Sequence, residues 1–390
     1  MKLAIVGIGQ CGGNIADLFY SVNRYSESFF HGRIEILTDA FAVNTDETDL
    51  GSFKHIPGDK GHRILVGTMS TFGHGVGKVN VDAASIIKAT SSEVIGSILK
   101  SAKFHESDAI FAIASCGGGT GSGIIGWIIK TLKERVDKPV YAILVLPFAF
   151  EERGEVSYAV TNSATCVNTV SRYADAIFLF DNECYRKAGN NLAQDFEEIN
   201  QEIAMSFYDL CCAGEERRQK YVGSKVVDAG DIKQSVEGIS VIGRGEVNLS
   251  TFRWRKEYYR EGIKENSLLF AALRKAETNL GMGIDLGQAG KILALITAPK
   301  HVISVSALEE IYSYLQQKSP KAVIRMGDYP RRSKDISVTL IASQLGKISR
   351  LEHLFLQAER LFKNQEQISR ELSAKDKFME ELKRTIPTLD

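Results

Sequence analysis

Three tight clusters of glycine occur in the first third of the sequence, and glycine turns are a common way for a backbone to bind phosphate. The 34 glycines among 390 residues exceed the average share of roughly 7% only slightly, so their placement carries the information. Glycine lets backbone N–H groups approach an anion, and a helix that follows adds its positive N-terminal end. The clusters are Gly7, Gly9, Gly12 and Gly13; Gly73, Gly75 and Gly77; and Gly117, Gly118, Gly119, Gly121 and Gly123. The first and third follow predicted strands, which indicates a site for several phosphates.

Two weaker interpretations of these clusters need to be compared. Gly7–Gly12 matches the G-x-G-x-x-G fingerprint of dinucleotide-binding oxidoreductases, but that fingerprint requires an acidic residue about twenty positions later. Asp39 and Asp46 come later than that, so a Rossmann-type oxidoreductase is the less favoured alternative. The run from Gly73 to Lys78 is one residue short of a P-loop and has Val79 where Ser or Thr would hold magnesium. We therefore do not interpret it as a P-loop.

Two aspartates further along the chain could activate water. Asp228 and Asp231 are three residues apart, so a helix that begins near Asp228 places both carboxylates on one face. Paired carboxylates can orient water and a cation opposite a phosphate. Asp228 could also simply cap the helix N-terminus, and the two roles are compatible.

The elements that would position these residues alternate between β and α over the first 180 residues. Short apolar runs predict strands, and apolar spacing of three and four residues predicts helices between them. The expected strands are Lys2–Val6, Ile34–Leu37, Ala109–Ser115, Val140–Pro147 and Ala176–Phe180, and the expected helices are Asn14–Val22, Ser92–Ser101, Ile124–Glu134 and Asn162–Tyr173. This alternation predicts an α/β fold with a Rossmann-like parallel sheet, which binds ligands at the carboxyl ends of its strands.

The rest of the chain has a different pattern. Helical spacing from Leu192 to Cys212 predicts a central helix that joins two domains. The pattern after it predicts a smaller α+β domain. Its expected strands are Ile239–Ile242, Ile292–Ala298, Val323–Met326 and Ile336–Ala342, and its expected helix is Ala307–Gln316. The charged tail keeps a three-four apolar repeat from Leu351 to Leu382. It predicts either helices packed along the body or a coiled-coil, partner-binding surface. We expect domains at 1–190 and 214–345, the central helix at 191–213 and a helical tail at 346–390.

Composition excludes several classes of protein. Lys+Arg and Asp+Glu number 48 each, so the net charge is zero, which argues against a nucleic-acid binder and against a strongly acidic, salt-adapted surface. Six cysteines without a C-x-x-C motif, and seven scattered histidines, argue against a disulfide framework and a zinc site. The longest apolar run is too short to span a bilayer, and the N-terminus has no signal-peptide pattern. We expect a cytoplasmic protein without an integral membrane segment.

The most specific motif is Ser-Cys-Gly-Gly-Gly-Thr-Gly-Ser-Gly at 115–123. It resembles the glycine-rich turn of the tubulin/FtsZ superfamily. Other segments resemble further nucleotide loops of that superfamily in the same order, namely Gly9–Asn14, Asn44–Asp46, Gly73–Gly77, Pro147–Glu151, Asp181–Glu183 and Phe196–Asn200. The resemblance runs from residue 1 to about 345 and is strongest to the archaeal CetZ group, which is intermediate between tubulin and FtsZ.

This resemblance implies GTP or GDP as ligand, with Mg²⁺ bridging phosphate oxygens. It implies that Asp46 holds the metal through water, although capping of its own loop is an equal alternative. Glu151 would accept from a ribose hydroxyl beside Asn182, Phe196 would stack on guanine, and Asn200 would bind the guanine edge. The implied nucleotide-binding residues are Gln10, Cys11, Gly12, Gly13, Asn14, Asn44, Asp46, Gly75, Gly117, Gly118, Gly119, Thr120, Gly121, Glu151, Asn182, Phe196 and Asn200.

The resemblance further implies a cytoskeletal GTPase that assembles head-to-tail, with acids of the next subunit completing the hydrolytic site. Asp231 would polarise the water and Asp228 would support it, in a filament acting in cell shape or division. Val226 stands where bacterial FtsZ has an asparagine, which favours one alternative, a nucleotide-binding member that polymerises weakly and acts as a regulator. The expected partners are further copies of the chain, together with proteins that bind the tail.

Overall fold

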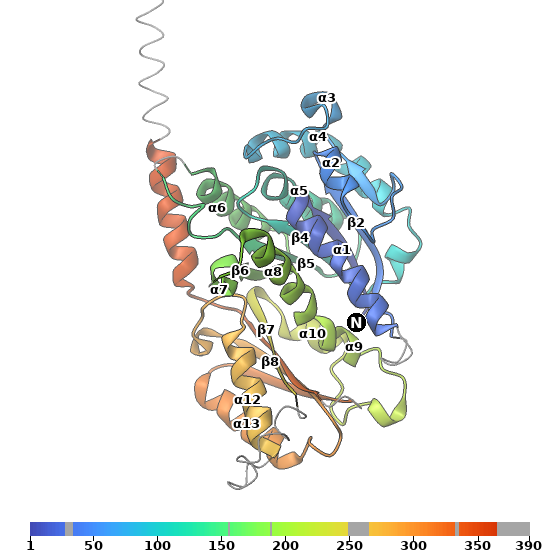
Figure 1. Ribbon diagram of the computed structural model, residues 1–390, viewed down its shortest axis with the longest axis vertical. Coiled ribbons are helices and arrows are strands. Elements are labelled where there is room, and N and C mark those ends of the chain that lie inside the picture. The colour runs from blue at the N-terminus through green and yellow to red at the C-terminus, as the bar shows by residue number, and fades with distance from the viewer. Residues whose placement is uncertain (28–33, 155–156, 188, 249–264, 332–334, 365–390) are drawn as a thin grey trace, which may run out of the picture.

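The computed structural model of the protein describes residues 1–27, 34–154, 157–187, 189–248, 265–331 and 335–364 (Figure 1). A ten-stranded sheet runs through both halves of the chain in the order β3-β2-β1-β4-β5-β6-β7-β10-β8-β9. The strands are β1 (Leu3–Ile8), β2 (Leu37–Asn44), β3 (Arg63–Leu65), β4 (Ala109–Ser115), β5 (Val140–Leu146), β6 (Ala176–Asp181), β7 (Gly238–Asn248), β8 (Lys291–Ala298), β9 (Val323–Pro330) and β10 (Asp335–Ser343). The strands from β3 to β7 pair in parallel, whereas β10 pairs antiparallel with β7 and β8.

Helices cover both faces of this sheet. They are α1 (Gly9–Ser26), α2 (Glu47–Gly51), α3 (Thr68–Thr71), α4 (Asn80–Ile98), α5 (Gly119–Arg135), α6 (Tyr158–Val170), α7 (Asn182–Tyr185), α8 (Leu192–Ser206), α9 (Tyr208–Ala213), α10 (Ala229–Ser235), α12 (Glu265–Thr278) and α13 (Val305–Lys318). Short 3₁₀ turns lie at Lys103–Glu106, Gln219–Tyr221 and Leu286–Gln288. None of the helices that the structure describes is both long enough and apolar enough to cross a membrane.

Alternate residues of the central strands divide the core into two layers. In β4, Phe111 and Ile113 belong to the layer under α1, α8 and α9, whereas Ile110 and Ala112 belong to the layer under α4, α5, α6, α12 and α13. Burial on both faces explains why this strand is a continuous apolar run in the sequence. The α/β fold with a Rossmann-like parallel sheet is confirmed.

Several elements differ from the sequence-based expectation. The second strand is Leu37–Asn44, not Ile34–Leu37. Asp39 lies inside this strand and is buried, and its carboxylate accepts a hydrogen bond from Ser101 Oγ at 2.5 Å. A buried polar residue breaks the apolar run by which a strand is recognised in the sequence, so the expected strand is misplaced. Helix α4 begins at Asn80, before the expected Ser92. The hydroxyls of Ser85 and Thr90 donate to carbonyls four residues earlier, so polar residues that obscure the apolar pattern are accommodated within the helix.

The central helix and the C-terminal helix also depart in detail from expectation. The expected helix over 192–212 is interrupted at Phe207, which separates α8 from α9 and packs against Phe111 with ring centroids 4.9 Å apart. The expected helix at 307–316 corresponds to α13, which is two residues longer at each end. Helix α12 was not predicted from the sequence. A further helix covers 349–364 and buries Leu351, Leu354 and Ala358 in the core. The remainder of the expected tail, 365–390, lies outside the described residues.

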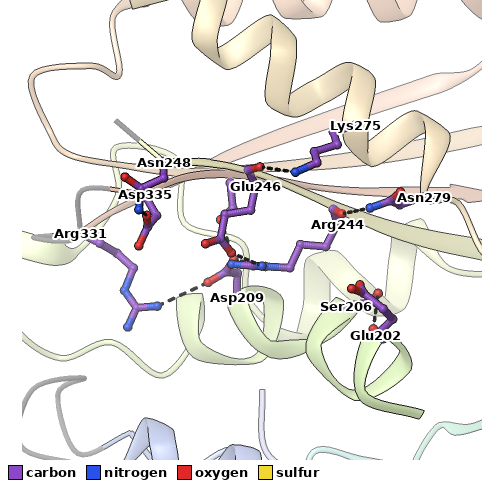
Figure 2. Close-up of polar contacts among 11 residues, drawn as sticks. Glu202, Ser206, Asp209, Arg244, Glu246, Asn248, Lys275, Asn279, Arg331 and Asp335 are labelled. Carbon is purple, nitrogen blue, oxygen red and sulfur yellow. Dashed lines mark hydrogen bonds and ion pairs between the residues drawn. The ribbon is translucent and has the colours of Figure 1, made fainter. Parts of the chain in front are cut away.

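A buried ionic cluster connects the central helices to the C-terminal half (Figure 2). Asp209, at the start of α9, accepts hydrogen bonds from Arg244 Nε of β7 at 2.9 Å and from Ser337 Oγ of β10 at 2.7 Å. Arg331 contacts the other carboxylate oxygen at 3.4 Å, and Arg244 also pairs with Glu246. Burial alone would raise the pKa of Asp209, but the two arginines lower it below its ordinary value. A charge buried this deeply is tolerated only because it is paired.

Candidate functional site

A cavity of about 840 Å³ opens at the carboxyl ends of the parallel strands, where open α/β sheets bind ligands. Its size is within the usual range for a small-molecule site. Fifteen of the seventeen nucleotide-binding residues that the sequence predicts line it, namely Gln10, Cys11, Asn14, Asn44, Asp46, Gly75, Gly117, Gly118, Gly119, Thr120, Gly121, Glu151, Asn182, Phe196 and Asn200. The fold thus brings residues that are far apart in the sequence together around one cavity.

Two long helices begin at this cavity without a side-chain cap. Helix α1 follows Ile8 and helix α5 follows Gly118, and neither of these N-cap residues has a side chain that accepts a hydrogen bond from the first N–H groups of its helix. The first N–H groups of a helix have no partner within the helix, and they carry the positive end of its dipole. Gly9 has φ +70°, and a Cβ there would lie 3.1 Å from the Gly121 nitrogen. Two uncapped helix N-termini therefore lie against each other, and this arrangement favours a ligand with several negative charges.

The second glycine cluster, Gly73–Gly77, lines the cavity beside the start of α5. Gly73, Gly75 and Gly77 all have positive φ, a backbone conformation that side chains disfavour. A Cβ on Gly119 would lie 2.4 Å from the Gly77 oxygen, so the loop packs directly on the start of α5. The cluster thus forms a loop with several residues in the left-handed backbone conformation, and this loop is not a P-loop.

Two predicted residues lie outside the cavity lining. A Cβ on Gly12 would lie 2.1 Å from the Ile113 oxygen of β4, and one on Gly13 would lie 2.2 Å from the Phe53 ring. Their glycine identity is therefore explained by close packing of α1 on the sheet and on the loop after α2. The sequence motif does not distinguish glycines that approach a ligand from glycines that approach their own chain.

The loop after β2 is organised by its own polar side chains. Asn44 Oδ1 accepts from the Thr45 nitrogen at 2.8 Å, and Asn44 Nδ2 donates to Asp49 Oδ2 at 3.0 Å. Asp46 Oδ1 accepts from the Asp49 nitrogen at 3.1 Å and caps α2. The Thr45 and Thr120 hydroxyl oxygens are 2.7 Å apart, which joins this loop to α5. The capping alternative for Asp46 is therefore realised.

The same loop carries two carboxylates that are suited to magnesium. No group of three or more His, Cys, Asp or Glu side chains that could hold a metal ion occurs among the described residues. Magnesium is usually held by one or two carboxylates together with phosphates and water, and two carboxylates, Asp46 and Asp49, line the cavity. Burial raises the pKa of Asp49, and Asp46 adds to that rise. A cation between these carboxylates and a phosphate would relieve the repulsion, so the residues fit the ion.

Polar and aromatic groups also line the cavity. Asn182 is buried, and its Oδ1 has no hydrogen-bond partner among the described residues. Phe196 is 37% exposed although it packs on Phe148 with ring centroids 5.5 Å apart. Burial raises the pKa of Glu151, and the charge of Lys78 partly offsets that rise. An unsatisfied amide oxygen beside an exposed ring and a carboxylate is suited to bind a sugar and a base.

Three further cavity residues were missed by the sequence analysis. Lys78 supplies a cation beside Glu151, and the signal was its position directly after the second glycine cluster. Asp49 supplies the second carboxylate, three residues after Asp46. Asp17 lines the cavity and accepts from the nitrogens of residues 54, 55 and 56, which nothing in the sequence indicates. Burial raises the pKa of the predicted Cys11 thiol to about 12, so it lines the site as a neutral group.

The two predicted acids lie apart from this cavity. Asp228 Oδ1 accepts from the Asp231 nitrogen at 2.9 Å, and Asp231 Oδ2 accepts from the Asp228 nitrogen at 3.3 Å. They form a reciprocal capping box at the start of α10. Asp228 is exposed and Asp231 is half-buried. The helix cap is therefore realised, and each carboxylate keeps one oxygen that is not used in the box.

Comparisons with known proteins agree with this geometry. Residues 2–190 match the family described as the GTPase domain of the tubulin/FtsZ family, and residues 189–360 match the C-terminal domain of tubulin-like CetZ proteins. Tubulin-like protein CetZ3 of Haloferax volcanii is 30% identical over 91% of this chain and 90% of its own length. A CetZ protein of Pyrococcus abyssi is 28% identical over 92% of this chain and 90% of its own length.

Solved structures show the same relationship. A GTPγS-bound protofilament of CetZ2 from Haloferax volcanii aligns with a TM-score of 0.79 at 27% identity, over 94% of this chain and all of the other. The GDP-bound monomer of CetZ1 from the same organism aligns with a TM-score of 0.78 at 27% identity, with the same coverage. Both halves of the chain, and not only its glycine-rich site, therefore have counterparts in one group of proteins. This chain belongs to the tubulin/FtsZ family, within its CetZ group.

Proposed function

We propose that the chain is a cytoskeletal GTPase that binds guanine nucleotide in the cavity, assembles head-to-tail into protofilaments and hydrolyses GTP at the contact between subunits. The observation that carries the proposal is the convergence of two uncapped helix N-termini, α1 and α5, on one cavity. The GDP of the CetZ1 structure and the GTPγS protofilament of the CetZ2 structure support guanine nucleotide and self-assembly.

The proposed binding roles follow from the chemistry of each wall. Backbone N–H groups at the starts of α1 and α5 hold the phosphates, with the Thr120 hydroxyl beside them. Asp46 and Asp49 would hold magnesium, which would neutralise part of the charge on the phosphates. At the other end, the free Oδ1 of Asn182 accepts a hydrogen bond, Glu151 accepts from a ribose hydroxyl, and Phe196 stacks on the base.

Hydrolysis is proposed to need the next subunit. The cavity of one subunit holds Asp46, Asp49 and Glu151 near its phosphate or ribose ends, whereas Asp228 and Asp231 lie outside it. We assign water activation to Asp231 of the adjoining copy, with Asp228 supporting it. The oxygens not used in the capping box are available for this role. A contact that repeats head-to-tail does not close, so it produces a filament.

Sedimentation with GTP, GDP or no nucleotide, scored together with phosphate release over a range of protein concentrations, tests the proposal. If hydrolysis needs the next subunit, phosphate release per subunit rises through the range of protein concentration in which pellets appear. A rate per subunit that stays constant would show that each subunit hydrolyses GTP alone. Binding of GTP without pellets would instead favour the weakly polymerising regulator, for which Val226 is the motivating residue.

Binding of a nicotinamide cofactor in place of GTP would favour the oxidoreductase alternative. We further propose that the filaments act in cell shape or division and that other proteins bind the C-terminal tail. Fluorescence microscopy of the tagged protein in its host, compared with a variant that cannot bind GTP, tests whether the filaments form in the cell. Filaments or rings that are lost in the variant are the expected result.

A further inference from the structure

One arginine of the C-terminal helix connects the two loops that carry Glu151 and Asn182. Arg350 Nε donates to Asp181 Oδ2 at 2.8 Å, and its Nη1 donates to Glu152 Oε2 at 3.0 Å. Its Nη2 donates to the other oxygen of Glu152, so the contact with Glu152 is bidentate. A bidentate guanidinium–carboxylate pair restrains both position and orientation. Arg350 therefore restrains the ends of β5 and β6 together, from a helix that is remote in sequence.

Each partner of Arg350 is next in sequence to a cavity residue. Glu152 follows Glu151, and Asp181 precedes Asn182, whose Oδ1 lacks a partner among the described residues. Asp181 also caps α7, because its Oδ1 accepts from the Glu183 nitrogen at 3.2 Å. With one oxygen on the cap and the other on Arg350, the Asp181 carboxylate fixes the backbone that carries Asn182.

A second contact joins the same two loops independently of Arg350. Glu183 Oε2 accepts from the Ala149 nitrogen at 3.1 Å. The carboxylates of Glu152 and Asp181 are nevertheless 7% and 6% exposed. Without the guanidinium, two nearly buried negative charges would face each other beside the ligand site. The loops would remain connected, but Glu151 and Asn182 would lose their fixed positions.

The C-terminal helix does not depend on this contact to stay in place. Leu351, Leu354 and Ala358 are buried in the core on its inner face. Figure 1 shows the helix along the flank of the N-terminal half, as the red segment that ends the described chain. Arg350 is thus a polar contact added to a helix that is already held by apolar packing.

We propose that Arg350 is a positioning residue for the nucleotide, one that acts through Glu151 and Asn182 and couples the C-terminal helix to nucleotide affinity. The proposal rests on the proposed function, because it assumes that the cavity binds guanine nucleotide. By linkage, a nucleotide held by the two loops strengthens the docking of the helix, and displacement of the helix releases the nucleotide. A protein that pulls the helix from the flank would therefore accelerate nucleotide exchange.

GDP affinity measured by isothermal titration calorimetry tests this proposal, because GDP avoids turnover. Arg350→Ala should weaken GDP binding at least tenfold, whereas Arg360→Ala should change it less than twofold. Arg360 is a matched control, an exposed arginine on the same helix. Thermal denaturation of the apo forms establishes that both variants are folded. Equal GDP affinity in Arg350→Ala and the wild type would overturn the proposal.

A mutant cycle distinguishes positioning from a general structural role. In a background in which Glu151 and Asn182 are both alanine, Arg350→Ala should weaken GDP binding less than twofold, because the residues through which it acts are gone. In a Phe196→Ala background its full effect should persist. An undiminished effect in the first background would show that Arg350 acts elsewhere.

Two further outcomes can be distinguished, namely misfolding of Arg350→Ala and failure of the wild-type protein to bind GDP. If Arg350→Ala does not fold, Glu152→Gln removes the charge pair while keeping the side-chain shape, and it should weaken GDP binding in the same direction. An unchanged affinity in folded Glu152→Gln would also overturn the proposal. Failure of the wild-type protein to bind GDP at all would refute the proposed function itself, whereas normal wild-type binding with an unaffected Arg350→Ala refutes only the positioning role.

Discussion

The two aspartates at the start of α10 offer a substitution that separates a structural role from a catalytic one. Each carboxylate accepts one backbone N–H in the capping box, at 2.9 and 3.3 Å. Asp228 is the N-cap residue of α10 and Asp231 is its third helical residue, so Asp231→Asn leaves the Asp228 cap in place. An asparagine Oδ1 can still accept the bond from the Asp228 nitrogen, so the substitution removes only the negative charge.

The expected magnitudes differ enough to be measured apart. Neither side chain is buried, so the loss in free energy of unfolding is about 0.3–1 kcal/mol, the contribution of a charge to the helix dipole. Loss of a group that activates water typically costs about 10²–10⁴ in rate, equivalent to about 2.7–5.4 kcal/mol. Asp228→Ala, in contrast, should lose about 0.5–2 kcal/mol of stability because the cap itself is removed.

The assay is phosphate release at a protein concentration above the assembly threshold, alongside urea denaturation and GDP titration. Asp231→Asn should bind GDP like the wild type, unfold at nearly the same urea concentration and hydrolyse GTP at least a hundredfold more slowly, with longer-lived filaments. Hydrolysis within twofold of the wild-type rate in both Asp228→Asn and Asp231→Asn would refute the reasoning. The two acids would then be helix caps only.

Other substitutions test the packing, the ionic cluster and the base-binding end. Gly12→Ala places a Cβ 2.1 Å from a β4 carbonyl oxygen and should cost about 1–3 kcal/mol in denaturation experiments. Gly118→Ala places a Cβ with no described atom within 4 Å, so it should cost only about 0.5–1 kcal/mol, as expected for a poorer N-cap of α5, and should mainly weaken GDP binding. Asp209 has a lowered pKa in the folded state, so its stabilising contribution is present above its unfolded pKa and is lost as pH falls through the folded value. Asp209→Asn should remove that acid dependence in urea titrations between pH 7 and pH 3, and it should cost about 3–5 kcal/mol at pH 7 because the two arginines of Figure 2 lose their shared partner. Phe196→Ala should weaken GDP binding by an amount equal to about 1–3 kcal/mol of stacking, and Phe150→Ala, at a similarly exposed ring, should leave the affinity unchanged in the same calorimetric titration.

The sequence by itself determined most of the strands that are buried on both faces, β2 excepted, and the loops that follow them. Ala109–Ser115 coincides with β4, because a strand covered on both sides must be a continuous apolar run. Asp228 and Asp231 were recognisable as a helix start, because capping depends on residues three apart in the chain. Both patterns arise from residues that are close together in the chain, so they can be recognised without knowledge of the tertiary structure.

Elements stabilised by partners far along the chain were harder to recognise. Strand β2 contains the buried Asp39, which is satisfied by Ser101, 62 residues away. Its polar residue breaks the apolar pattern, so the expected strand was displaced toward Ile34–Leu37. Helix α12 did carry an apolar pattern, since Leu269, Ala272, Leu273 and Ala276 are buried on one face, and it was missed although the signal was present.

The composition of the site was largely readable from its motifs, but the role of each residue was decided by tertiary structure. Gly12 and Gly118 belong to similar glycine clusters, yet one packs against a neighbouring strand and the other opens to the cavity. Lys78 and Arg350 show the same limit, because only the folded chain places one in the cavity and the other behind Glu152 and Asp181. A motif records which residue types a turn requires. Whether such a residue faces a ligand or its own protein depends on what the rest of the chain packs against it.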